Sequence, residues 1–264
     1  MLPEPDIVAL IEHARTASGD ELKSLIHEAN ETVLLALLEN SNLDETHVAH
    51  LLERLDLPAT ILSTIAEKGK WTSSESVRLR LARHPRTPKR IALAVVRQLY
   101  LLDLVRVSLL PSTPADIRRV AEEVILTRIP HIPVGEKLTL ARRGPSRVAG
   151  ALLAEGHPQV LKLALGNAFL TESQVLKVLS KSGIAERVVK AIAQHPKWSS
   201  QYNVRLALIR NSHTPILRVE EFLPDLVLRD LKSIAEMDGL VPHLKKMIQQ
   251  DLARRVDAAL GNKP

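Results

Sequence analysis

The 264-residue chain contains no cysteine, which excludes disulfide bonds, thiol nucleophiles and cysteine-ligated zinc. Aromatic residues make up only 2% of it, which disfavours a β-rich fold because strands are usually rich in aromatic residues. Apolar runs long enough to span a membrane are absent, and the opening residues MLPEPDIVALIEHA place acidic residues and prolines where a signal peptide is basic and then apolar. We therefore expect a helical protein that is cytoplasmic and does not enter membranes.

A stretch that occurs twice is the most informative feature of the chain. KWTSSESVRLRLARHPRTP starts at position 70 and KWSSQYNVRLALIRNSHTP starts at position 197, an offset of 127. The same offset aligns identical residues without a gap over most of the chain, and self-similarity at a fixed offset is typical of repeat proteins. The sequence thus predicts a tandem duplication, with one half at 1–130 and the other at 131–264, stacked continuously as one curved body.

Short helices separated by capping residues and prolines are expected throughout. Apolar residues recur at helical spacing, and Asp20 and Asp44 are predicted N-caps. In each Thr-Pro dipeptide the threonine hydroxyl is predicted to cap a helix whose first residue is the proline. The expected helices include 6–16, 20–29, 32–39, 44–54 and 58–68, and the dipeptides lie at 87–88, 113–114 and 214–215. This pattern predicts an all-α solenoid in which each helical unit contacts its neighbours.

The pattern VRLRLARHPRTP resembles the repeat signature of bacterial α-solenoids of the HEAT-like and leucine-rich-repeat-variant type. The matching positions are Val77, Arg78, Leu81, Ala82, Pro85, Thr87 and Pro88. The resemblance implies a right-handed stack of short helices with a binding surface. It implies no single activity, because such solenoids mostly act as scaffolds and a few bind or modify DNA.

Six residues at equivalent positions of the two halves are predicted to be structural. The two tryptophans are expected to fill the gap before a helix, since an aromatic ring buries much surface; the alternative is a stacking platform for a base or a partner. Charged residues inside apolar helices are expected to be paired, because an unpaired buried charge is costly. These six are Trp71 and Trp198, Arg78 with Asp103, and Arg205 with Asp230.

Catalytic and metal-binding patterns are absent from the sequence. His47 and His50 share a helix face, but no third ligand is evident, so we expect no metal. Phosphate loops, nucleophile elbows and dinucleotide fingerprints are also missing. We therefore predict a protein without cofactors that is not an enzyme.

Charge distinguishes the two halves. Between positions 76 and 102 there is no acidic residue, but there are seven cations: Arg78, Arg80, Arg83, Arg86, Lys89, Arg90 and Arg97. With a net charge of +6, this predicts a basic patch in the middle of the chain. Our first hypothesis is an interaction module that binds a protein partner. The second is a solenoid that binds the backbone of double-stranded nucleic acid through this patch.

Overall fold

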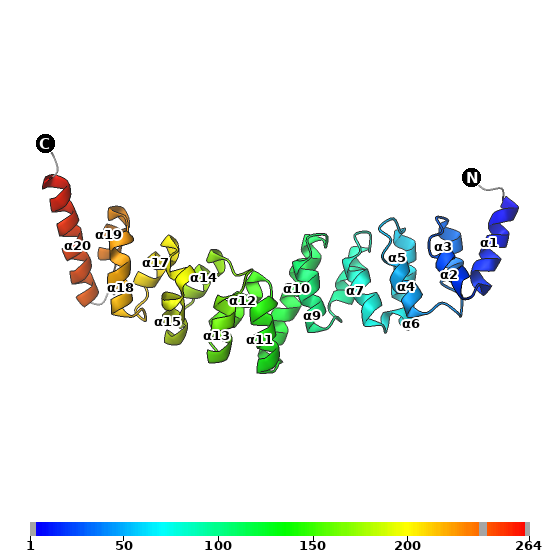
Figure 1. The fold of residues 1–264 in the computed structure, drawn as a ribbon, viewed down its shortest axis with the longest axis horizontal. Helices are drawn as coiled ribbons and strands as arrows, with labels where there is room; N and C mark the ends of the chain where they lie inside the picture. The colour runs from blue at the N-terminus through cyan, green and yellow to red at the C-terminus, as the bar shows by residue number, and fades with distance from the viewer. Residues whose placement is uncertain (1–3, 238–241, 262–264) are drawn as a thin grey trace. The chain divides into compact units, whose positions relative to one another are not determined.

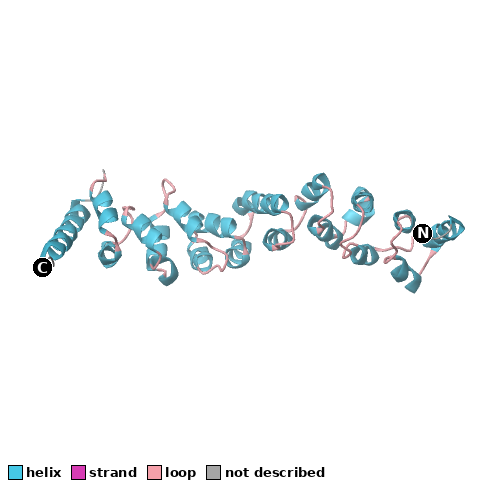
Figure 2. Cartoon of the chain, turned by 90° about the horizontal axis from the view of Figure 1, so that it is seen from above, coloured by secondary structure: helices cyan, strands magenta, loops and turns pink. Residues whose placement is uncertain are grey.

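The computed structural model describes residues 4–237 and 242–261, and this part of the chain consists of helices and loops without a strand (Figures 1 and 2). It divides into two compact units, Met1–Arg128 and Ile129–Pro264. None of its helices is long and apolar enough to cross a bilayer. The protein is therefore all-α, as the sequence predicts.

The first unit contains ten helices in its described residues. They are α1 (Glu4–Thr16), α2 (Asp20–Leu25), α3 (Glu31–Leu37), α4 (Glu45–Leu51), α5 (Ala59–Glu67), α6 (Gly69–Thr72), α7 (Glu75–Arg83), α8 (Lys89–Val96), α9 (Leu101–Leu109) and α10 (Ala115–Arg128). Within this unit α1 packs on α3, α7 on α8 and α9 on α10, so helices close in sequence are neighbours in space.

The described part of the second unit contains ten α-helices and two short 3-10 helices. They are η1 (Ile129–His131), α11 (Val134–Arg143), α12 (Ser146–Glu155), α13 (Pro158–Leu165), α14 (Glu172–Leu179), α15 (Glu186–Gln194), α16 (Pro196–Ser199), α17 (Tyr202–Ile209), α18 (Ile216–Phe222), η2 (Leu223–Asp225), α19 (Leu228–Ala235) and α20 (Pro242–Gly261). Each α-helix from α1 to α10 overlaps one from α11 to α20 when 127 is added to its residue numbers.

Aliphatic side chains at helical spacing build the core of both units. In α5 the side chains of Ile61, Leu62 and Ile65 are fully buried, and in α15 those of Val188 and Ile192 are. Because burial of each such side chain contributes about 1.5–3 kcal/mol, even helices of two turns are held in place by packing. Leu, Ile, Val and Ala fill these interiors, which explains how the fold forms with so few aromatic rings.

Capping confirms one of the two predicted aspartate caps and corrects the other. Asp44 caps α4, where its carboxylate accepts a hydrogen bond from the His47 N–H at 2.9 Å. At α2, by contrast, Gly19 is the N-cap at φ 57°, and Asp20 lies in the first turn paired with Lys23. Thr171 precedes α14 but bonds Ser146 instead of the helix.

The Thr-Pro dipeptides do start helices, but not as predicted. The helices α8, α10 and α18 begin one residue after the proline, so the proline precedes the first helical residue and the threonine is too early to cap. The hydroxyls of Thr87 and Thr113 are buried without a partner among the described residues, and that of Thr214 donates to the Leu208 carbonyl at 2.6 Å.

Candidate functional site

Trp71 and Trp198 are both buried, with 2% of each residue exposed. Lys70 and Lys197 each lie over the adjacent indole ring, 4.3 Å from its centroid. With this little exposed surface, neither ring can stack on a base or on a partner side chain.

The two indoles differ in their hydrogen bonding. Trp198 Nε1 donates to the carbonyl of Leu165 at 2.8 Å. In the first unit the equivalent carbonyl, that of Leu38, accepts from the Lys68 ammonium at 2.9 Å, and Trp71 Nε1 has no partner among the described residues. A lysine has thus replaced the indole as the donor to that carbonyl.

Arg78 does not pair directly with Asp103. Its guanidinium bonds the Glu75 carboxylate and the Thr72 carbonyl, and Asp103 bonds Arg106 at 2.7 Å. Glu75 and Asp103 lie close enough to share a hydrogen bond once one of them is protonated, and this contact links the two pairs into one network. The direct pair is therefore wrong, but the alternative of a shared polar network is found in this unit.

The two carboxyls of this network differ in pKa. Burial, followed by the neighbouring Glu75, raises the pKa of Asp103 above its usual value. Burial also acts to raise the pKa of Glu75, but the Tyr100 N–H, Arg78 and Asp103 outweigh it and hold that pKa below its usual range. On acidification Asp103 is therefore the first of the two to take up a proton.

In the second unit the predicted link between Arg205 and Asp230 is wrong. Arg205 pairs with Asp225 and donates to the Ser199 carbonyl. Asp230 instead accepts a hydrogen bond from the Tyr202 hydroxyl at 2.5 Å. Helical periodicity predicts which charges are half-buried but not which of several carboxylates lies within reach of a long arginine side chain.

Four of the seven cations predicted to form the basic patch are occupied by contacts within the unit. Besides Arg78, Arg80 pairs with Glu53 at 3.2 Å, Arg86 donates to the Asp56 carbonyl at 2.6 Å, and Lys89 pairs with Asp116 at 2.7 Å. The side chains of the other three have no hydrogen-bond or ion-pair partner among the described residues: Arg83, Arg90 and Arg97. The charge available to a ligand is thus smaller than the sequence indicates.

One of these free cations, Arg83, lines a groove of about 560 Å³ that we call the Leu55 groove. Leu55 is 68% exposed at its edge, and the other lining residues are Leu52, Glu53, Leu79, Arg80, His84, Pro85, Leu110 and Ser112. The groove therefore combines exposed aliphatic surface with a guanidinium that has no internal partner.

His84 forms part of the groove wall and is held firmly. Its Nε2 lies 2.7 Å from the Arg54 carbonyl oxygen, and its Nδ1 accepts from the Arg86 N–H at 3.2 Å. These contacts select the neutral ring with its proton on Nε2. Burial lowers the pKa of His84, in agreement with the neutral form.

A second groove, of about 500 Å³, adjoins the first at Glu53 and is lined by Lys23, Ile26, His27, Thr46, His47, His50 and Arg54. His47 Nδ1 lies 2.7 Å from the Asp44 carboxylate, which already caps α4. Among the described residues no three histidine or carboxylate side chains are arranged to hold a metal ion.

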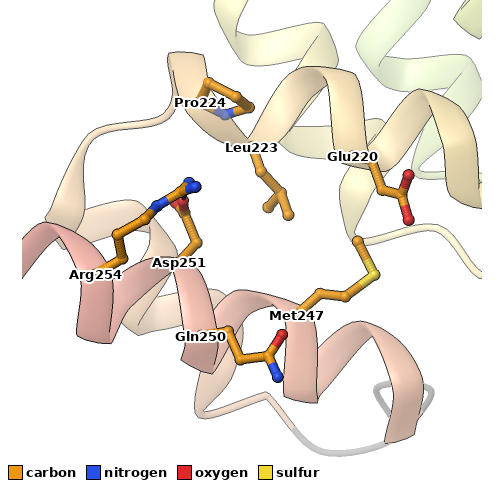
Figure 3. Close-up of a pocket in the computed structure, with 7 residues that line it drawn as sticks. All are labelled: Glu220, Leu223, Pro224, Met247, Gln250, Asp251 and Arg254. Atoms are coloured by element: carbon orange, nitrogen blue, oxygen red, sulfur yellow. Dashed lines mark hydrogen bonds and ion pairs between the residues drawn. The ribbon is translucent and has the colours of Figure 1, made fainter.

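In the second unit, α18, η2 and α20 enclose a pocket of about 280 Å³ (Figure 3). Asp251 and Arg254 pair with each other along α20, and Asp251 also contacts Arg255 at 2.7 Å. Arg255 in turn donates to the carbonyls of Leu226 and Leu223. Asp251 thus contacts Arg255, the residue beside the pocket that ties α20 to Leu223 and Leu226.

Comparison of the chain with protein-family models, curated proteins and solved structures finds no match. The groove residues themselves therefore carry the functional argument. Sequence reasoning missed Leu55, Leu110 and Glu53, since nothing in their spacing shows that the turns after α4 and α9 lie on either side of the end of α7.

Proposed function

We propose that this protein is a non-enzymatic interaction module, a right-handed α-solenoid of the HEAT-like and leucine-rich-repeat-variant type that arose by tandem duplication. It binds an acidic, partly apolar segment of a protein partner in the Leu55 groove. A cytoplasmic location stays a prediction.

Equivalent hydrogen bonds in the two units support the duplication. Arg128 donates to the Leu99 carbonyl at 2.8 Å, and Arg255 to the Leu226 carbonyl at 2.6 Å. Both pairs are related by the offset of 127, as are the helices that contain the arginines. The correspondence therefore extends beyond identical residues to the contacts that join successive helices.

The observation that carries the proposed function is the juxtaposition of Leu55 and Arg83 in one groove. Burying an aliphatic side chain that is 68% exposed against a partner is favourable, because it removes apolar surface from water. A guanidinium without an internal carboxylate can form an ion pair with a carboxylate of the partner. An acidic segment with apolar side chains offers both. The surface is specific to the first unit, because the counterparts of Leu55 and Arg80 are Ser182 and Ala207.

Binding of a labelled peptide with leucines interspersed among glutamates, measured by fluorescence anisotropy, tests the proposal. Wild type and the variants Leu55→Asp and Arg83→Glu are compared with Arg210→Glu, which changes the counterpart of Arg83 in the second unit. We expect each groove variant to weaken binding about tenfold, the scale of one lost anchor, and Arg210→Glu to leave it nearly unchanged.

A labelled DNA duplex at low and moderate salt forms the second arm of the experiment. Duplex binding that weakens steeply with salt and is lost in Arg90→Glu and Arg97→Glu, without peptide binding, would overturn the proposal in favour of a nucleic-acid partner. Equal peptide binding by all variants would also overturn it.

A further inference from the structure

Two buried asparagines at equivalent positions join neighbouring helices in the same way in the two units. One joins α1 to the end of α3, and the other joins α11 to the end of α13. Asn40 Nδ2 donates to the carbonyls of Ala14 and Ala17 at 2.8 and 3.0 Å. Asn167, its counterpart, donates to those of Ala141 and Gly144 at the same two distances. Residues next to these anchors are therefore placed alike in the two units.

One such neighbour in the first unit is Arg15, which follows Ala14 on α1. Its guanidinium lies 3.0 Å from the Glu12 carboxylate and 3.3 Å from that of Glu39, the residue before Asn40. The first unit thus has two carboxylates of its own around this arginine.

The second unit keeps the arginine and has lost both carboxylates. Arg142 corresponds to Arg15, but Thr139 stands at the position of Glu12 and Gly166 at that of Glu39. Arg142 is exposed and makes no hydrogen bond or ion pair with another described residue. Arg142 therefore occupies a backbone position equivalent to that of Arg15 but lacks the two carboxylates that surround Arg15.

A further cation follows Arg142 directly. Arg143 is exposed and has no partner in the described part of the chain, and its counterpart is the uncharged Thr16. The change from two carboxylates and one arginine to two arginines makes this the more positive of the two equivalent surfaces.

A groove of about 320 Å³ lies at this point, lined by Leu138, Thr139, Arg142, Arg143 and Leu163. We propose that this Arg142 groove is a second binding site, which takes two neighbouring carboxylates of an acidic protein segment. The carboxylates of Glu12 and Glu39 in the first unit show the arrangement that the incoming pair adopts. The half-buried Leu138 and Leu163 supply apolar contact beside the charges.

Restoring the internal carboxylates is the sharpest test, because the backbone tolerates it. A Cβ at Gly166 would meet only the carbonyl oxygens of Lys162 and Leu163, at 3.4 and 3.8 Å, which are ordinary contacts, and Gly166 has φ −84°. The double variant Thr139→Glu/Gly166→Glu should therefore fold. Its two new carboxylates should then pair with Arg142 and block the site.

We would titrate the full chain with a short poly-glutamate peptide by calorimetry. All variants also carry Leu55→Asp and Arg83→Glu, which remove the proposed site in the Leu55 groove. The measurement then reports on the Arg142 groove alone, whether or not the Leu55 groove binds peptide. In this background the unchanged second unit should bind the peptide. Adding Thr139→Glu/Gly166→Glu should weaken binding about tenfold or more, the scale expected from several lost ion pairs.

The reverse exchange in the first unit is the matched control. Glu12→Thr with Glu39→Gly should free Arg15 and add a site, so that peptide stoichiometry rises. Retention of full peptide binding by a folded Thr139→Glu/Gly166→Glu protein, with its melting temperature unchanged, would overturn the proposal. So would binding of phosphate or of a DNA duplex to this groove in preference to the peptide.

Discussion

Glu75 and Tyr202 occupy equivalent positions in the two units and make equivalent contacts with different chemistry. The Glu75 carboxylate accepts from the Tyr100 N–H at 3.0 Å and lies beside the Asp103 carboxyl. The Tyr202 hydroxyl accepts from the Val227 N–H at 3.3 Å and donates to Asp230. In each unit one side chain thus contacts both the start of a helix, α9 or α19, and a carboxyl in the first turn of that helix.

We predict that Tyr202→Phe lowers the free energy of unfolding by about 1–3 kcal/mol, since it leaves a half-buried carboxylate and a backbone N–H without their partner. Glu75→Gln should lower it by a similar amount, because the amide oxygen still accepts from the Tyr100 N–H but the ion pair with Arg78 is lost. Urea denaturation followed by circular dichroism measures both. An unchanged denaturation midpoint for either variant would contradict this account.

Acidification should destabilise the first unit through His84. Burial holds the pKa of His84 below its unfolded value of about 6.5, so the unfolded chain binds the proton more readily. The contribution of the neutral His84 to stability is fully present above about pH 6.5, the pKa of a histidine in the unfolded chain. It is lost as the pH falls from there through the lower pKa of His84 in the folded protein. His195, whose pKa is also lowered by burial and by Lys197, should act in the same direction on the stability of the second unit.

His84→Asn copies the second unit, in which Asn211 accepts from the His213 N–H at 3.0 Å as His84 does from Arg86. This variant should show a shallower loss of stability between about pH 7 and 5, measured as melting temperature against pH. An unchanged slope would contradict the role of His84.

Arg128 should be more important for stability than its position at the end of α10 indicates. Its two guanidinium nitrogens donate to the carbonyls of Leu99 and Arg97, both at 2.8 Å. A lysine cannot reproduce this planar pair of donors, so Arg128→Lys should cost about 1–3 kcal/mol. The exposed Arg90→Lys is the control and should cost less than about 0.5 kcal/mol. Equal denaturation midpoints for the two variants would show that the carbonyl contacts contribute nothing.

Glu53 lies between the two grooves of the first unit and pairs with Arg80 at 3.2 Å and with His50 at 3.7 Å. Hydrogen bonding to Arg80 lowers the pKa of Glu53, so it is ionised at neutral pH. Glu53→Gln removes this internal competitor and should tighten binding of the acidic, leucine-containing peptide by about threefold, the scale of one exposed ion pair. Weaker binding by this variant in anisotropy titrations would contradict the prediction.

The all-helical fold could be predicted because apolar residues recur at helical spacing and caps and prolines separate the segments. Asp44 shows how local this information is, since its side chain reaches a backbone N–H only three residues away. The expected helices around 32–39 and 58–68 appear as Glu31–Leu37 and Ala59–Glu67 for the same reason.

Contacts between helices were harder to predict. Arg205 reaches Asp225, twenty positions on, and the sequence gives no rotation of α17 that would favour this carboxylate over Asp230. The role of Glu75 was missed because a search for identical pairs passes over a glutamate that corresponds to a tyrosine. Equally, Gly166 stands where the first unit has Glu39, and this difference becomes informative only once the structure shows that Glu39 pairs with Arg15, the counterpart of Arg142.

The only two tryptophans lie one in each unit, and of their indole N–H groups only that of Trp198 has a hydrogen-bond partner among the described residues. The two indole protons should therefore give separate NMR resonances, with the hydrogen-bonded proton of Trp198 further downfield and slower to exchange. Single Trp→Phe variants would then leave one fluorophore in one unit. The chain thus carries an intrinsic spectroscopic reporter for each half, by which melting of the two units can be followed separately without a dye.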